Sequence, residues 1–78
     1  MYYVYLLKCS NGALYTGITN DVDKRMEAHR SGKGSKYVRA HLPFTLVYQE
    51  ECADKTTAMK REAEIKSWPR YRKLDLIS

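Results

Sequence analysis

An Asn-Gly pair between two apolar runs is the feature that most constrains the fold of this chain. Residues 2–7 and 13–18 are apolar-rich, and Ser10-Asn11-Gly12 lies between them. Asn and Gly both tolerate the positive φ that tight hairpin turns require, so the pattern predicts a β-hairpin with strands over 2–9 and 13–18. Because the first strand is nearly continuously apolar, we expect both of its faces to be covered by other elements.

Helical and strand patterns alternate after the hairpin. We expect a helix from Asn20 or Asp21 to about residue 30, followed by a basic connection over 31–42 with one helical turn near 37–40. A strand over 44–48 comes next. The chain then forms a helix from Asp54 or Thr56 to about residue 68, and a short helix over 70–77 that docks on the core through Leu74 and Ile77. Asp caps helix N-termini, Gly ends helices and Pro interrupts them. These expectations describe a single α+β domain over residues 1–78. Its order is β-β-α-β-α-α, with a three-stranded antiparallel sheet flanked by helices.

The charge distribution favours a polyanionic partner. The formal net charge is +5, and residues 24–41 carry six Lys or Arg against one Glu. Nucleic acid is the expected partner, although a basic surface can also serve solubility alone. Cys9 and Cys52 lack the spacing of a zinc site, and neither a signal peptide nor a membrane span is apparent. We therefore expect reduced thiols and a cytoplasmic protein.

One carboxylate of the helix after residue 54 falls within an apolar arc. Ala58, Met59, Glu62 and Ile65 share this arc at 100° per residue. A buried carboxylate is costly without a cation, so Glu62 is a candidate metal ligand. The alternative is a structural carboxylate at the edge of the stripe, paired with Lys66 at i+4.

The helix after residue 20 carries Arg25 and His29 on one face, four residues apart. This face is expected to meet Tyr5 and Tyr15 on the two hairpin strands. A structural role, with the arginine over the sheet edge and the histidine against the core, is the alternative. Together with a cation on Glu62, the set predicts phosphodiester hydrolysis: an arginine for the phosphate and a tyrosine for the proton of the attacking water.

The same residues carry a resemblance to a known family. The motifs YVY at residues 3–5 and YTG at residues 15–17, followed by Arg25-x-x-x-His29 and by Glu62, resemble the GIY-YIG nuclease superfamily, in particular its small, stand-alone bacterial members. The resemblance implies a β-β-α-β-α core and metal-dependent DNA cleavage. It also implies the following roles: Tyr5 and Tyr15 position or deprotonate water, Arg25 binds phosphate, His29 assists in proton transfer, and Glu62 is the single ligand of Mg²⁺ or Mn²⁺.

The chain departs from this family in two places. Ile18 stands where excision-repair members such as UvrC have a lysine that can acidify the tyrosine, and no asparagine follows Glu62. The missing positive charge would have to come from Lys24, Lys36 or the metal. No second DNA-binding domain is visible, so affinity is expected from a protein partner or from the basic surface: Lys24, Lys33, Lys36 and Arg39.

The leading prediction is a metal-dependent DNA endonuclease, directed by DNA structure rather than by sequence, because no base-reading element is visible. Tyr15 is the expected base, with Tyr5 beside it. The second hypothesis is a nucleic-acid-binding module with weak or no cleavage, an accessory to a repair complex. A small interaction protein whose charge confers only solubility is the third.

Overall fold

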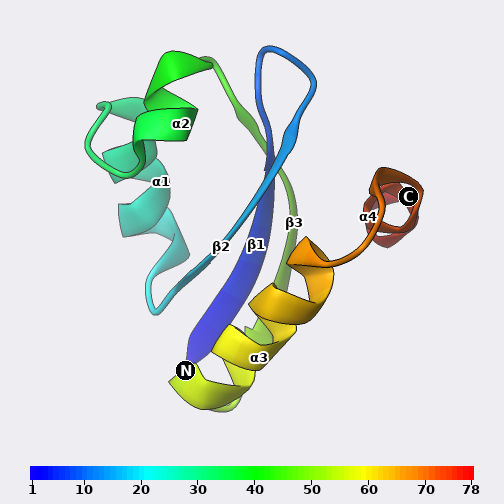
Figure 1. The fold of residues 1–78 in the computed structure, drawn as a ribbon. Coiled ribbons are helices and arrows are strands. Elements are labelled where there is room, and N and C mark those ends of the chain that lie inside the picture. The colour runs from blue at the N-terminus through cyan, green and yellow to red at the C-terminus, as the bar shows by residue number, and fades with distance from the viewer.

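A three-stranded antiparallel sheet in the order β2-β1-β3 separates two layers of helices. The computed structural model describes all residues, 1–78. Figure 1 shows α1 and α2 on one side of the sheet and α3 and α4 on the other. The elements are β1 (Tyr2–Lys8), β2 (Leu14–Thr19), α1 (Val22–Arg30), α2 (Lys36–Ala40), β3 (Thr45–Cys52), α3 (Lys55–Lys66) and α4 (Arg70–Ile77). The α+β class and the antiparallel sheet are confirmed, with α2 as an additional short helix where one helical turn was expected.

The predicted hairpin joins β1 and β2, but its turn differs from the expectation. Gly12 has φ +84°, whereas Asn11 keeps a negative φ. The Gly12 N–H donates to the Cys9 carbonyl at 2.9 Å, and the Asn11 side chain accepts from the Ala13 N–H at 3.1 Å. A three-residue loop of this kind needs a left-handed residue only at its last position, so only the glycine adopts it.

Strand β3 continues four residues beyond the predicted end at residue 48. It pairs with β1 from Thr45 to Cys52, with an irregularity opposite Leu6 and Leu7. The extension includes polar residues, because an edge strand is held by its backbone hydrogen bonds and can expose alternate side chains. A prediction based only on apolar residues therefore ends this strand too early.

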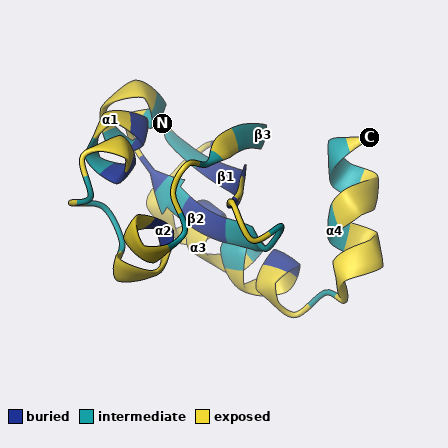
Figure 2. Ribbon diagram, turned by 90° about the horizontal axis from the view of Figure 1, so that it is seen from above, coloured by how far each residue is buried: buried dark blue, intermediate teal, exposed yellow.

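The alternation of β1 places a separate core on each face of the sheet, as predicted. Val4 and Leu6 pack with Ala58 and Ile65 of α3, and Leu76 and Ile77 of α4 join them. On the other face, the buried cluster consists of Tyr5, Leu7, Met26 and Val38. Figure 2 shows the buried segments concentrated along β1 and β2 between these layers. The two faces thus have different chemistry, since only the second contains buried polar aromatic groups.

Two apolar side chains expected to face the core are exposed. Met59 is 51 % exposed, because it is rotated by about 100° from the line of Ala58 that faces the sheet. Leu74 is 42 % exposed, and Leu76, about 200° further around α4, packs on the core in its place. Helix α3 ends at Lys66, two residues before the expected end. None of the helices has the length and apolar character that crossing a membrane requires.

Candidate active site

A buried tyrosine–histidine pair lies at the centre of the candidate site. The Tyr5 hydroxyl and His29 Nε2 are 2.8 Å apart, and the two side chains come from β1 and α1. Tyr5 is 2 % exposed and His29 1 % exposed. Burial lowers the pKa of His29, and the positive charge of Arg25 lowers it further, so the imidazole is neutral at pH 7.

The pKa of the Tyr5 hydroxyl is affected by the other candidate residues. Burial is the main cause of its raised pKa; Tyr15 and the carboxylate of Glu62 raise the pKa further, and Arg25 opposes the shift. Electrostatic effects of this kind extend beyond direct contact, so they relate Arg25 and Glu62 to the Tyr5 hydroxyl through their charge. Tyr5 is therefore held protonated, with His29 as its hydrogen-bond partner.

The glycine of the YTG motif makes room for the Tyr5 ring. Gly17 lies directly opposite Tyr5 in the β1–β2 ladder. A Cβ at this position would overlap the Tyr5 hydroxyl oxygen and lie 2.6 Å from Cζ, closer than real Cβ atoms approach their neighbours. The Tyr5 ring therefore crosses β2 over Gly17, which brings its hydroxyl to the edge of the sheet.

Tyr15 is held from two sides by aromatic rings. It meets His29 edge-on at 5.8 Å between ring centroids, and Tyr37 of α2 stacks on it at 6.3 Å with 12° between the planes. The Tyr37 hydroxyl in turn accepts a hydrogen bond from Asn11 Nδ2 at 3.2 Å. No local sequence pattern connects α2 with the hairpin, so the sequence alone does not predict this contact. The stack fixes the Tyr15 ring beside His29.

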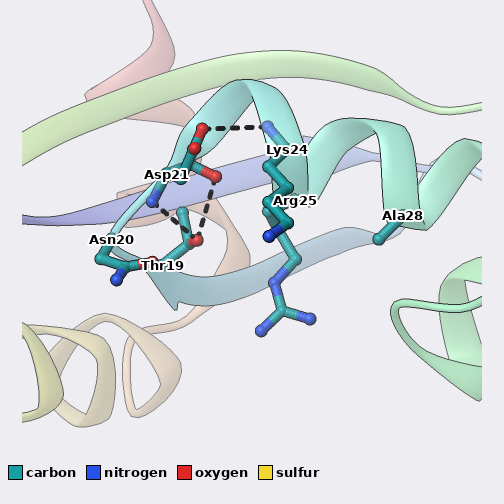
Figure 3. Close-up of a pocket in the computed structure, with 6 residues that line it drawn as sticks. All are labelled: Thr19, Asn20, Asp21, Lys24, Arg25 and Ala28. Carbon is teal, nitrogen blue, oxygen red and sulfur yellow. Dashed lines mark hydrogen bonds between the residues drawn. The ribbon is translucent and has the colours of Figure 1, made fainter.

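Arg25 lines an open polar pocket at the start of α1. The pocket has a volume of about 250 Å³ and is lined by Thr19, Asn20, Asp21, Lys24, Arg25 and Ala28. Asp21 caps α1 by accepting from the Lys24 N–H at 3.0 Å, and Thr19 binds the Asp21 backbone (Figure 3). The Arg25 guanidinium extends away from this capped turn, and no carboxylate lies within ion-pair distance of it. A free cation in an open pocket is suited to an anion such as a phosphate.

Glu62 belongs to α3, on the opposite face of the sheet from Arg25. Its side chain is 22 % exposed, and Oε2 lies 3.4 Å from Lys66 Nζ, as the structural alternative predicted. Its charge nevertheless contributes to the raised pKa of Tyr5. Glu64, by contrast, is ion-paired to Arg61 at 2.7 Å and is 55 % exposed.

The residues present fit a cation held by a single carboxylate. No group of three or more His, Cys, Asp or Glu side chains is arranged to hold a metal ion. Mg²⁺ is usually held by one or two carboxylates together with water and substrate phosphate oxygens, so such a group is not required. Glu62 satisfies this condition if Lys66 releases it.

The basic residues expected to bind nucleic acid lie on the layer of α1 and α2. Lys24 is on α1, Lys33 follows it, and Lys36 and Arg39 are on α2; all are exposed and none is ion-paired. Only Lys24 lines the pocket with Arg25. The free cysteines Cys9 and Cys52 are both buried and take no part in this site.

Comparison with known proteins agrees with this architecture. A family model described as the GIY-YIG catalytic domain matches residues 1–75. The UPF0213 protein SSP2268 of Staphylococcus saprophyticus is 48 % identical over 77 residues, covering 99 % of this chain and 94 % of the relative. A UPF0213 protein of Staphylococcus aureus strain Mu3 is 50 % identical over 76 residues, or 97 % of this chain and 93 % of the relative.

A solved structure supports the same assignment. The solution NMR structure of the UPF0213 protein BH0048 from Bacillus halodurans aligns with a TM-score of 0.63 and 46 % identity, covering 99 % of this chain and 83 % of that chain. The resemblance inferred from the sequence motifs is therefore confirmed. The chain belongs to the GIY-YIG nuclease family, among its small bacterial UPF0213 members.

Proposed function

We propose that this protein is a metal-dependent endonuclease that hydrolyses phosphodiester bonds of DNA and selects its substrate by structure rather than by sequence. The observation that carries the proposal is the convergence on the Tyr5 hydroxyl. His29 Nε2 lies 2.8 Å from it, the Tyr15 ring meets the same imidazole edge-on, and the charges of Arg25 and Glu62 shift the pKa of Tyr5 in opposite directions. A tyrosine pair, a free guanidinium and a carboxylate around one point form a set suited to phosphoryl chemistry.

The two tyrosines have different roles in this proposal. Tyr5 has a raised pKa and a neutral imidazole partner, so it keeps its proton and orients the attacking water through its hydroxyl. Tyr15 is only half-buried and takes the proton of that water. His29 assists by orienting the Tyr5 hydroxyl through Nε2, and Arg25 holds the phosphate from the open pocket.

Glu62 is the residue that would hold the divalent cation, Mg²⁺ or Mn²⁺. When bound, this cation supplies Lewis-acid stabilisation of charge on the phosphate and on the leaving oxygen. Lys66, now 3.4 Å from Glu62 Oε2, would turn to solvent or to the DNA backbone. Backbone phosphates would be contacted by Lys24, Lys33, Lys36 and Arg39. Such contacts carry no information about the base sequence.

A cleavage screen over flaps, branched junctions, duplexes and single strands with Mn²⁺ tests the proposal. We expect Glu62→Gln and Tyr15→Phe each to lower the cleavage rate by about 100-fold or more. Glu64→Gln is the matched control on the same helix, because this exposed carboxylate pairs only with Arg61, and it should keep full activity. Equal activity in the native chain and all three variants would mean a contaminating nuclease and would overturn the proposal.

The Glu62–Lys66 ion pair favours a second candidate, a DNA-binding accessory module. If the lysine permanently neutralises the carboxylate, no metal enters and binding proceeds without cleavage. In that case Mn²⁺ would not bind by calorimetry, and Glu62→Gln would leave DNA affinity unchanged. Lys66→Gln should then create Mn²⁺ binding that the native chain lacks, whereas in the nuclease the native chain already binds Mn²⁺ and Lys66→Gln should only strengthen that binding.

A further inference from the structure

The segment after α1 folds back onto the last turn of that helix. Gly32 turns the chain with φ +82°, and the backbone N–H groups of Lys33 and Gly34 both donate to the Ala28 carbonyl, at 2.9 and 3.1 Å. This return places the Cα of Gly34 against the imidazole of His29.

Position 34 requires glycine because a Cβ has no space there, and not because of the backbone conformation. Its φ lies outside the left-handed region, which only Gly12 and Gly32 adopt. A Cβ on Gly34 would lie 2.5 Å from His29 Nδ1 and 2.9 Å from Cε1 and Cγ. An alanine at this position would therefore be unstrained in its backbone but would overlap the ring.

The His29 ring is buried and is packed against three aromatic rings. It is 1 % exposed, and the rings of Tyr5, Tyr15 and Phe44 meet it edge-on at 5.8, 5.8 and 5.9 Å between centroids. Interiors this closely packed transmit a displacement rather than absorb it. A Cβ at residue 34 would therefore displace the ring from its present position.

Hydrogen bonding alone does not fix this imidazole. Nε2 has the Tyr5 hydroxyl as its partner, whereas the buried Nδ1 has none. A histidine that takes part in catalysis is usually oriented by a second hydrogen bond at its other nitrogen. Here, contact with the bare Cα of Gly34 occupies that position.

We propose that Gly34 is a positioning residue. Its bare Cα packs directly against the His29 ring and so keeps Nε2 within hydrogen-bonding distance of the Tyr5 hydroxyl. Its consequence for cleavage rests on the proposed nuclease function. The placement of the ring itself does not, and it can be measured without any activity.

The first test follows the Cε1–H resonance of His29 by NMR against pH in the native chain and in Gly34→Ala. The charged or polar groups facing the ring are Tyr5, Tyr15 and Arg25, and none of them is altered. We expect the displaced ring to gain water and its pKa to rise toward the ordinary 6.5. An unchanged titration curve in the folded variant would overturn the proposal.

Gly32→Ala is the matched control in the same loop. Its φ of +82° makes any side chain strained, but the nearest atoms are the flexible Cδ and Cγ of Arg39. We expect this variant to lower Tm while the His29 titration stays as in the native chain. A shift in both variants would assign the effect to loop disruption and reject the specific role of Gly34.

A stability cycle keeps the proposal testable if Gly34→Ala does not fold. His29→Ala removes the ring that a Cβ at residue 34 would meet, so Gly34→Ala should lower Tm by less than half as much in the His29→Ala background. An equal loss of Tm in both backgrounds would overturn the proposal.

Cleavage then links the placement to function. If the nuclease proposal holds, Gly34→Ala should lower kcat by about 10- to 100-fold with little change in KM, and should add nothing to the loss in His29→Ala. Additive losses would reject action through His29. A native chain that cleaves nothing would overturn the nuclease proposal but leave the NMR and Tm results valid.

Discussion

The two threonines of β2 differ in hydrogen bonding although they are three residues apart. Thr19, 8 % exposed, donates to the Asp21 carbonyl and accepts from the Asp21 N–H, both at 3.1 Å. Thr16, 4 % exposed, has a buried hydroxyl without a partner. A buried hydroxyl of this kind costs free energy, because it loses water and gains nothing in return.

We therefore expect Thr16→Val to raise the free energy of unfolding by about 1 kcal/mol, since valine keeps the shape and removes the hydroxyl. Thr19→Val should instead lower it by about 1–2 kcal/mol, because the Asp21 N–H at the start of α1 loses its partner. Urea unfolding of both variants measures the difference. A loss of stability in Thr16→Val would mean that its hydroxyl has a partner such as bound water.

The buried His29 makes folding stability dependent on pH. Its pKa in the folded protein is lower than the ordinary 6.5 of the unfolded chain. The unfolded state therefore binds more protons as the pH falls below about 6.5, and stability decreases by at most about 1.4 kcal/mol per pH unit until the folded pKa is passed.

His29→Gln removes this contribution. Its stability relative to the native chain should therefore improve as the pH falls from 7.5 to 5, as measured by guanidinium unfolding at each pH. A difference between the two proteins that stays constant over this range would contradict the neutral, buried imidazole.

At the scale of elements, Arg61 connects α3 to the rest of the molecule. Its Nε binds Glu50 of β3 at 3.0 Å, its Nη1 binds Glu64 at 2.7 Å, and its guanidinium lies 5.1 Å from the Trp68 ring centroid. Tyr48 also donates to Glu50, at 2.6 Å. This network fixes the helix that carries Glu62 against an edge strand.

Arg61→Met should lower the free energy of unfolding by about 1–2 kcal/mol, since it leaves the partly buried Glu50 without its cation. Arg30→Met is the matched control: its pair with Glu27 is 3.8 Å long and its side chain is 62 % exposed, so the change should stay within about 0.5 kcal/mol. Chemical denaturation of both variants measures the two changes in the free energy of unfolding. Equal losses would mean that helix packing alone holds α3.

At the scale of the whole molecule, the sheet separates two basic regions. Lys33, Lys36 and Arg39 belong to the layer of α1 and α2, whereas Arg70 and Lys73 are on α4 beyond the opposite face (Figure 1). The pocket of Arg25 opens among residues of the β2–α1 turn and of α1. DNA bound to Arg25 is therefore expected to run along the α1–α2 layer.

The double variant Lys36→Gln/Arg39→Gln should reduce the slope of log affinity against log salt by about 2, which corresponds to two lost phosphate contacts on a duplex. Arg70→Gln/Lys73→Gln, with the same change in net charge, should leave the slope unchanged. Fluorescence anisotropy without divalent metal measures both while preventing cleavage. An equal reduction in the two variants would place DNA over α4 as well.

The sequence by itself determined the features that depend on neighbours along the chain. The hairpin followed from Asn11 and Gly12, and the two faces of β1 followed from its alternation. Capping by Asp21 and Asp54 was predictable for the same reason. Turn, strand and helix geometry act over a few residues, so a local pattern contains the information.

Only the tertiary structure decided how the site is assembled. The stacking of Tyr37 on Tyr15 and the contact of Gly34 with His29 bring together residues that no local pattern connects. The length of β3 was likewise set by pairing with β1 rather than by its own polar residues. These contacts depend on how two helical layers and a sheet pack together, and packing at that range is a property of the folded chain as a whole.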